Sequence, residues 1–456
     1  MKPITQSEFA ALSSDKAAHW IWLVPILAAW GVHTSGAMTL ENVLQTTLEK
    51  NPAIQEAKSG VEQAAGQRLV LRSMIWPKVT IAVPAGVQGG HRAGEDKTKA
   101  FAFARGFFTQ TLFNAAVPPS LRRGDVDVLI AQQQLNVAVV EQLHQARLAF
   151  YAALYSRSLQ SIREEQQQRL EENVATQKNR YEAGLTDRSA FTSATVQARE
   201  LDSQIESAQR AYAEARLQLA QIMGRDLGQN ATLPEPEGDL KIASVFLNVD
   251  SEAAAALERR ADLKLARLLI RTANEDQRII EAGYYPAVVG NVTGDYIPIT
   301  GIHREGSTSR TQDFISSEIR ERAGYTWRVI DNGKVRGATL RARATREINE
   351  LTCRKLETDI RRELARIANN LKAIEGRERS LAAAEASAQE GARVVHQNVA
   401  GGLASQLEYR LTQKGLLETR SGLLDAIYQH NLAVAEWDRA AGRYFQFSED
   451  TAENVH

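Results

Sequence analysis

The stretch GLTDRSAFTSATVQARELDSQIESAQRAYAEARLQLAQIMG, residues 184–224, decides the fold. Between its two terminal glycines it contains neither Gly nor Pro, the residues that most disfavour a helix. Its apolar residues recur at alternating spacings of four and three, at Leu201, Ile205, Ala208, Tyr212, Ala215, Leu219 and Ile222. This heptad seam predicts a helix over Ser189–Ile222 that packs along other helices in a left-handed supercoil.

The sequence before this stretch predicts a second helix of unusual length. Residues 125–183 also lack Gly and Pro and are rich in Gln, Leu, Ala, Glu and Arg, which favour helices. A helix over Arg122–Tyr181 would be about 90 Å long at 1.5 Å per residue. Gly184, which tolerates a left-handed backbone, would form the tip of a helical hairpin.

Two further regions alternate with the two-residue period of β-strands. Residues 78–113 predict a β-hairpin with a polar tip at His91–Lys99, and residues 287–330 predict a second one with a loop at Thr300–Asp313. Each run of about 12 residues is close to the length of a tilted strand that crosses a bilayer. In Phe314–Ile330 an apolar-enriched face opposes a charged one, as expected between lipid and water.

The chain repeats itself. Residues 52–79 align with residues 261–288 at a constant offset of 209, and Gly184–Gly224 aligns with Gly402–Gly442 at an offset of 218. The second long helix carries its own seam at Ile360, Leu364, Ile367, Leu371 and Ile374. We therefore expect two copies of one unit, a helix, a β-hairpin, a long helix and a return helix.

These observations give the expected domain boundaries. The first repeat covers residues 38–230 with its tip at 184–189, a linker covers 231–250, and the second repeat covers 251–444 with its tip at 401–408. A loosely ordered tail is expected over 445–456.

The N-terminus, residues 1–37, is typical of a cleaved secretory signal peptide. Lys2 and Lys16 precede an apolar core at Trp20–Trp30, and Ser35–Ala37 form a small-x-small cleavage site. The alternative is an uncleaved membrane anchor, but the apolar core is shorter than the span of about 20 residues that a bilayer needs. Cleavage is favoured.

Composition argues against several functions. The 456 residues carry 55 basic and 55 acidic side chains, which does not favour nucleic acid as a partner. The single cysteine, Cys353, excludes an intramolecular disulfide and a multi-cysteine metal site. The eight histidines are scattered, with no phosphate loop or nucleophile elbow beside them. We expect no enzyme activity, no cofactor and no metal, and a packed role for His430 on the seam of the last helix.

Several motifs together resemble one known family. Gly184-Leu185 with Ser189, and Gly402-Leu403 with Ser405 and Glu408, resemble the hairpin tips of the TolC-like outer-membrane efflux proteins, also called outer membrane factors. Asn114, Asp331-Asn332-Gly333 and the segment 258–263 resemble the family's strand-to-helix junctions and repeat start. The resemblance covers residues 40–442.

The resemblance implies a mainly α fold with β-strands, in which three copies form a homotrimer. Each copy would give four strands to one transmembrane β-barrel in outer-membrane lipid and its long helices to an α-barrel in the periplasm. It also implies a passive gated duct of a tripartite efflux or type I secretion system, with a periplasmic adaptor (membrane fusion) protein and an inner-membrane transporter as partners. The expected location is the outer membrane of a Gram-negative cell.

The same resemblance places a gate at the two tips. We expect it to involve Gly184, Thr186, Asp187, Arg188, Ser189, Gly402, Ser405 and Glu408. Ala190 replaces the family's acid at the first tip, and Ala404 stands where some members carry a gate-locking arginine. For Thr186, Ser189 and Ser405, N-capping of the return helices is an equally simple role.

A different class of function also fits long coiled coils, namely a soluble periplasmic adaptor or scaffold. Such an adaptor needs one helical hairpin inserted in a β-domain. The two bilayer-length β-hairpins, one in each repeat, favour the channel.

Overall fold

The computed structural model describes residues 37–92, 95–226, 228, 232–242, 245, 247–296 and 317–448. The chain divides into two units, Met1–Ala37 and Met38–His456, and the second is described here. The expected signal peptide, except for Ala37, and the loop Thr300–Asp313 lie outside the described residues.

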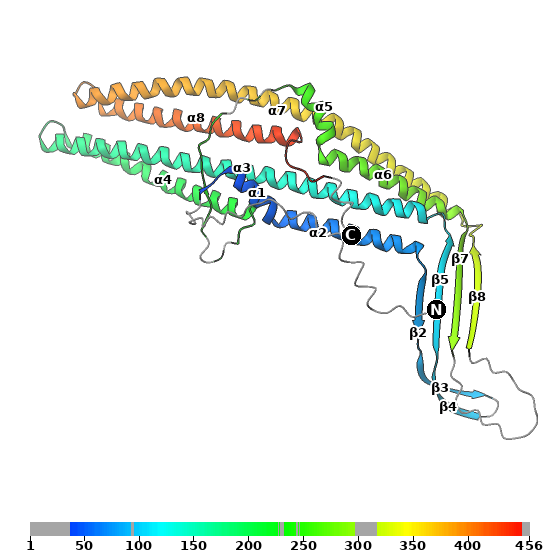
Figure 1. Cartoon of the computed structure of the whole chain (residues 1–456). Coiled ribbons are helices and arrows are strands. Elements are labelled where there is room, and N and C mark those ends of the chain that lie inside the picture. The colour runs from blue at the N-terminus through cyan, green and yellow to red at the C-terminus, as the bar shows by residue number, and fades with distance from the viewer. Residues whose placement is uncertain are drawn as a thin grey trace, which may run out of the picture. The chain divides into compact units, whose positions relative to one another are not determined.

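Four long helices form two hairpins. The first hairpin pairs α3 (Val117–Glu182) with α4 (Arg188–Ile222), and the second pairs α7 (Lys334–Ala400) with α8 (Gln406–Ala440). Figure 1 shows their tips at the same end, away from the strands. The expected long helix is confirmed, although it begins earlier because Pro118 fits its first turn. None of the helices in the described ranges combines the length and the apolarity needed to cross a membrane.

Short helices precede the strands in each half of the chain. Asn51 ends the first of them and starts the second, where its side chain accepts hydrogen bonds from the backbone N–H groups of Ala53 and Ile54. Pro52 occupies the first helical position, where its missing N–H is not needed. These helices are α1 (Leu40–Lys50), α2 (Pro52–Arg72), η1 (Ser73–Ile75), α5 (Val249–Arg259), α6 (Ala261–Glu281) and η2 (Ala282–Tyr284).

The heptad seams form the core of the hairpins, as the sequence predicts. Along α7, Ile360, Leu364 and Leu371 are buried and pack with Trp437 of α8. Along α4, Leu201 and Ile205 pack with Leu170 of α3. Burial of these side chains, worth about 1.5–3 kcal/mol each, holds the hairpins together.

Four strands form one antiparallel sheet. Their order across the sheet is β2 (Lys78–Ala82), β5 (Ala104–Phe113), β7 (Ala287–Tyr296) and β8 (Ser317–Thr326). Both of the predicted β-hairpins therefore contribute two strands to it. Strands β3 (Ala85–Arg92) and β4 (Glu95–Ala102) form a separate ladder beyond it, and β1 (Ala37–Met38) pairs with β6 (Glu235–Pro236). Strands β2 and β8 each have one unpaired edge within the described residues.

The register gives the sheet two different faces, because directly paired residues point to the same side. We call one the polar face: Lys78, Thr80, Ala82, Arg105, Phe107, Thr109, Thr111, Ala287, Val289, Asn291, Thr293, Asp295, Glu318, Arg320, Arg322, Gly324 and Thr326. We call the other the apolar face: Val79, Ile81, Ala104, Gly106, Phe108, Gln110, Phe113, Val288, Gly290, Val292, Gly294, Tyr296, Ile319, Glu321, Ala323 and Tyr325. Glu321 is the one charged residue among those of the apolar face.

Three expectations are wrong. His91–Lys99 is not a loop, since β3 and β4 pair as far as Arg92 with Glu95, and backbone pairing does not require apolar side chains. The strand Phe314–Ile330 ends at Thr326, because Thr326 pairs with the first residue of β7 and no partner strand continues beyond. The expectation of a loose tail is wrong at its start, since the backbone of Phe447 exchanges hydrogen bonds with Asn136 of α3 at 2.8 and 3.1 Å, while residues 449–456 lie outside the described residues.

Candidate functional site

The two hairpin tips share one backbone geometry. Gly184 and Gly402 have φ of 71° and 78°, in the left-handed region, as the sequence predicts. The N–H of Leu185 donates to the carbonyl of Arg180 at 2.8 Å, and that of Leu403 donates to the carbonyl of Asn398 at 2.7 Å. This is a Schellman closure, which satisfies the last carbonyls of α3 and α7.

The return helices are capped by Asp187 and Ser405. The Asp187 carboxylate accepts from the N–H of Ala190 at 2.9 Å, and the Ser405 hydroxyl accepts from the N–H of Glu408 at 3.1 Å. Capping by Ser405 is therefore confirmed, whereas capping by Thr186 or Ser189 is wrong. Asp187 immediately precedes Arg188, the first residue of α4, and has the extended backbone that a cap needs.

Most of the expected gate residues are exposed at the tips. Asp187, Arg188, Ser189 and Glu408 are exposed, and Thr186 is half-buried. Beside them the two tip leucines are exposed as well, Leu185 to 71% and Leu403 to 84%. The tips thus combine exposed charges with exposed apolar side chains, which a surface that meets another molecule would have.

A residue that the sequence reasoning missed connects the two tips. The guanidinium of Arg180, in the last turn of α3, donates to the carbonyl of Val399 in the last turn of α7 at 3.2 Å. Cations favour helix C-termini because unpaired carbonyls concentrate negative charge there. Arg180 therefore stabilises the ends of two helices at once. The sequence around Arg180 does not predict this contact, because its partner lies 219 residues away along the chain.

Buried amides continue this contact below the tips. Asn173 donates to Gln406 at 3.2 Å, and Gln166 donates to Gln413 at 3.3 Å, both between α3 and α8. These side chains are largely buried, and each such hydrogen bond contributes about 0.5–1.5 kcal/mol to the packing of the two hairpins. Specific polar contacts thus hold the two hairpins against each other near their tips.

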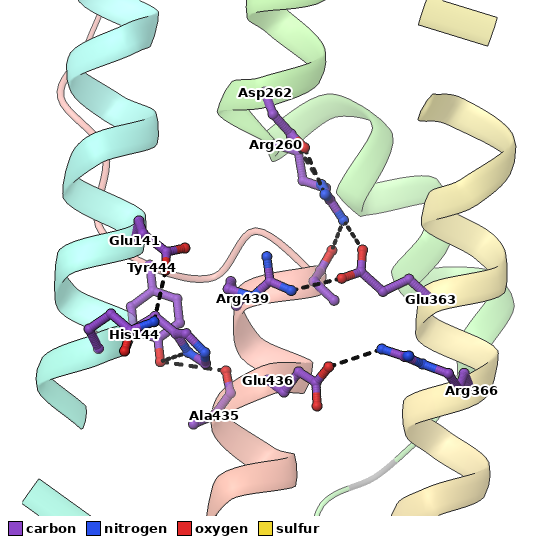
Figure 2. Close-up of polar contacts among 12 residues, drawn as sticks. Glu141, His144, Arg260, Asp262, Glu363, Arg366, Ala435, Glu436, Arg439 and Tyr444 are labelled. Atoms are coloured by element: carbon purple, nitrogen blue, oxygen red, sulfur yellow. Dashed lines mark hydrogen bonds and ion pairs between the residues drawn. The ribbon is translucent and has the colours of Figure 1, made fainter. Parts of the chain in front are cut away.

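A second polar network lies where α5 and α6 meet the long helices (Figure 2). Arg260 donates to Asp262, to Glu363 of α7 and to the carbonyl of Ala440 in α8, at 2.7 to 3.2 Å. Arg439 donates to the same Glu363 at 2.9 Å. Burial alone would lower the pKa of Arg260, but the two carboxylates outweigh it and raise that pKa. The network fixes the last turn of α8 on its neighbours.

Figure 2 also shows His144 of α3 facing Tyr444, just after α8. The Nδ1 atom of His144 lies 3.3 Å from the hydroxyl oxygen of Tyr444. Burial raises the pKa of Tyr444 to about 12, and burial with the nearby Arg439 lowers the pKa of His144. Both side chains are therefore neutral at neutral pH. His144 also lines a polar cavity of about 560 Å³ with Glu141, Asn370 and Arg439.

The histidine on the α8 seam is packed, as the sequence predicts. His430 is fully buried, and neither of its ring nitrogens has a hydrogen-bond partner among the described residues. Its Nε2 atom lies 4.0 Å from a carboxylate oxygen of Glu375. Burial lowers the pKa of His430, against the opposing effect of Glu375 and Glu378. In the described part of the chain, no group of His, Cys, Asp and Glu could hold a metal ion.

Comparison with known proteins identifies the fold and its function. The sequence model of the outer membrane efflux protein family matches residues 43–225 and 253–443. The chain belongs to this family. This outer membrane efflux protein is therefore an efflux channel of the outer membrane that extends into the periplasm. Members of the family are channel proteins, and the soluble adaptor is not favoured.

Solved structures share the fold at low sequence identity. VceC of Vibrio cholerae is 16% identical, with a TM-score of 0.74 over 88% of this chain and 96% of its own. CmeC of Campylobacter jejuni is 14% identical, with a TM-score of 0.76 over 94% of this chain and 93% of its own. CusC is 15% identical, with a TM-score of 0.74 over 88% of this chain and 92% of its own. No curated protein sequence matches the efflux protein.

Proposed function

We propose that three copies of the chain join into one duct, in which their strands close a membrane barrel and their helices form a periplasmic α-barrel. Family channels form trimers and work with adaptors and inner-membrane transporters. By the same proposal, the hairpin tips hold the resting gate and meet such partners. By the same proposal, the duct is passive, and the inner-membrane transporter supplies the energy for export.

The single observation that carries this proposal is the open, two-faced sheet. Four strands cannot close a barrel alone, and each unpaired backbone group at an edge in lipid costs several kcal/mol. All neighbouring strands are antiparallel, so β8 of one copy and β2 of the next would also run antiparallel. The apolar face would then meet lipid, and the polar face would line the water-filled interior.

Exposed aromatic side chains support this placement of the sheet. Each strand of the sheet has at least one of them within it or no more than three residues from its end that adjoins the helices: Trp76, Phe113, Tyr284, Tyr285, Tyr325 and Trp327. Aromatic girdles of this kind mark the interface between a membrane and water. The helix end of the sheet would therefore lie at the periplasmic surface of the membrane.

An unpartnered stripe on α7 supports the association of copies. Leu340, Ile348 and Leu351 are each 57% to 61% exposed, and with Gly337 and Ala344 they follow the three- and four-residue spacing of one helix face. Water disfavours such a stripe by roughly 1.5–3 kcal/mol for each leucine or isoleucine left uncovered. A helix of a neighbouring copy would cover it.

We also propose that the chain is a duplicated unit, with boundaries at 38–230 and 251–444. The helices α2 and α6 both contain 21 residues, and α4 and α8 both contain 35. Asn51 donates to the carbonyl of Ile222 at 2.7 Å, and Arg260 donates to that of Ala440 at 3.2 Å. Each residue thus ties a return helix to the start of its own half in the same way.

Cysteine cross-linking across the sheet edges tests the trimer. Thr80→Cys in β2 is combined in turn with Arg320→Cys, Arg322→Cys and Gly324→Cys in β8, all on one side of the sheet. We expect one combination to give disulfide-linked dimers and trimers on a non-reducing gel. The native Cys353 is buried and should not interfere.

Thr80→Cys with Thr293→Cys is the matched control for this cross-linking. Thr293 lies in β7, an inner strand with both edges paired, so this combination should give no linked copies. Failure of all three edge combinations, in protein extracted from the outer membrane, would contradict the closed barrel.

A further inference from the structure

The charged residues of the polar face do not balance. Four are basic and two are acidic: Lys78, Arg105, Arg320 and Arg322 against Asp295 and Glu318. Arg105 pairs with Asp295 across β5 and β7 at 2.5 Å, and Arg320 pairs with Glu318 within β8. Both acids are thus engaged, which leaves Lys78 and Arg322 as the excess.

Lys78 and Arg322 occupy the two ends of one cross-strand row. Lys78 pairs with Thr109, Thr109 with Asn291, and Asn291 with Arg322, so the row runs from one open edge to the other. Both cations are exposed, and within the described ranges neither has a carboxylate at ion-pair distance. The row lies at the helix end of the sheet, since Lys78 is the first residue of β2.

The chain that continues from this row is also basic. Arg328, Lys334, Arg336, Arg341 and Arg343 are exposed, and none of them forms an ion pair with a described residue. The first turn of α7 contains no acidic residue, although acids are favoured there. The nearest acid, Asp331, already accepts hydrogen bonds from the N–H groups of Gly333 and Val335.

Among the described residues, the acids near the opposite edge of the sheet are already paired. At the start of α3, Arg122 pairs with Glu275, and Arg123 pairs with Asp127 and Asp276. Asp125 pairs with Arg72 at the end of α2 at 3.2 Å. When β8 of one copy lies beside β2 of the next, cations therefore meet cations, and like charges on neighbouring strands are destabilising.

We infer that Lys78 and Arg322 of each copy form an anion-binding band inside the duct, at the helix end of the sheet. This inference rests on the proposed closure of the sheet. A narrow polar interior with low-dielectric walls concentrates the field of such charges. Guanidinium and ammonium groups suit small polyvalent anions that carry phosphate groups or several carboxylates. The band therefore favours this class of solute in the barrel section.

Calorimetric titration of the detergent-purified trimer with pyrophosphate tests the band. We expect saturable binding by the wild type that weakens as KCl is raised, because salt screens exposed charges. In the variant Lys78→Gln with Arg322→Gln, affinity should fall at least about tenfold, since two charges near the anion are lost from each copy. Added from the barrel side of a planar bilayer, pyrophosphate should also reduce the wild-type current and affect the variant less.

Glu321→Gln is the matched control. It changes the residue next to Arg322 in the same strand, but on the apolar face, so pyrophosphate affinity should stay as in the wild type. Equal affinity of wild type and double variant, or a conducting wild-type trimer that does not bind pyrophosphate, would overturn the band alone. A purified chain that forms no trimer and no conducting channel would overturn the duct and the band together.

Discussion

Two glycines at the ends of the return helices are required by close backbone contacts. Gly224 has φ of 66°, and a Cβ added there would lie 2.3 Å from the carbonyl oxygen of Lys50. Gly442 has φ of 68°, and a Cβ added there would lie more loosely, 3.2 Å from the Cβ of Arg259 and 3.3 Å from the backbone nitrogen of Arg260. The absent side chain lets each return helix end directly against the turn between two short helices.

Gly224→Ala should therefore destabilise the protein more than Gly184→Ala. Both positions have a left-handed backbone, which costs alanine about 1–2 kcal/mol. Only Gly224 adds a backbone clash, and overpacking costs about 1–3 kcal/mol more. Thermal denaturation of the two variants in detergent measures the difference. Equal losses of melting temperature in the two variants would contradict this prediction, because they would show that the backbone at Lys50 moves to make room for the alanine.

The buried His430 makes the protein sensitive to acid. Its pKa is lowered in the folded state, so the folded state resists the proton that the unfolded state accepts. Above the ordinary histidine pKa of about 6.5 neither state is protonated, and stability is then lost as pH falls below that value. His430→Leu should make the fall in melting temperature between about pH 7.5 and 5.5 shallower.

His396→Leu provides the control for this measurement. His396 is exposed on α7, so this variant removes a histidine without changing a buried position, and its pH dependence is the reference for that of His430→Leu. A His430→Leu variant that loses stability with acid as steeply as the wild type would contradict the assignment.

The two tip glycines and the Ser405 cap could be predicted from the sequence, but the cap of α4 could not. A glycine between two long helical patterns has one simple role, and Gly184 and Gly402 have it. In contrast, Thr186, Asp187 and Ser189 can all cap a helix, and the choice depends on which residue adopts the extended backbone. The Schellman closure sets that position, so Asp187 became the cap.

At the scale of the elements, the proposed gate can be separated from helix capping. Asp187→Ser removes the charge and keeps a capping side chain, as Ser405 does in the second hairpin. Combined with Glu408→Gln, it should raise single-channel conductance or change cation selectivity in planar bilayers, with no loss of thermal stability. Unchanged conductance and selectivity would remove both carboxylates from the gate.

Helices were easier to predict than strands. A seam such as Ile360, Leu364 and Leu371 has one stable arrangement, burial against a neighbouring helix, so the sequence pattern determines the element. The strands β3 and β4 carry polar residues where they pair, and their ladder depends on backbone hydrogen bonds that the side-chain pattern does not reveal.

At the scale of the whole chain, the contacts between its two halves could not be predicted. Arg147 pairs with Asp438 at 2.7 Å across 291 residues, and Arg180 reaches Val399 across 219. Such contacts depend on how the hairpins pack, which a spacing pattern within one helix does not contain. The repeat offsets predicted which segments are equivalent, but not which of their side chains meet.

The even number of strands in each copy has a consequence for stoichiometry. Because the first and last strands of the sheet run in opposite directions, rings of two, three or four copies would all restore an alternating order at every junction. Strand polarity thus tolerates several ring sizes. The number of copies is then set by the long helices. The angle at which the exposed stripe of α7 packs on a helix of the neighbouring copy sets the curvature of the α-barrel, and with it the width of the channel.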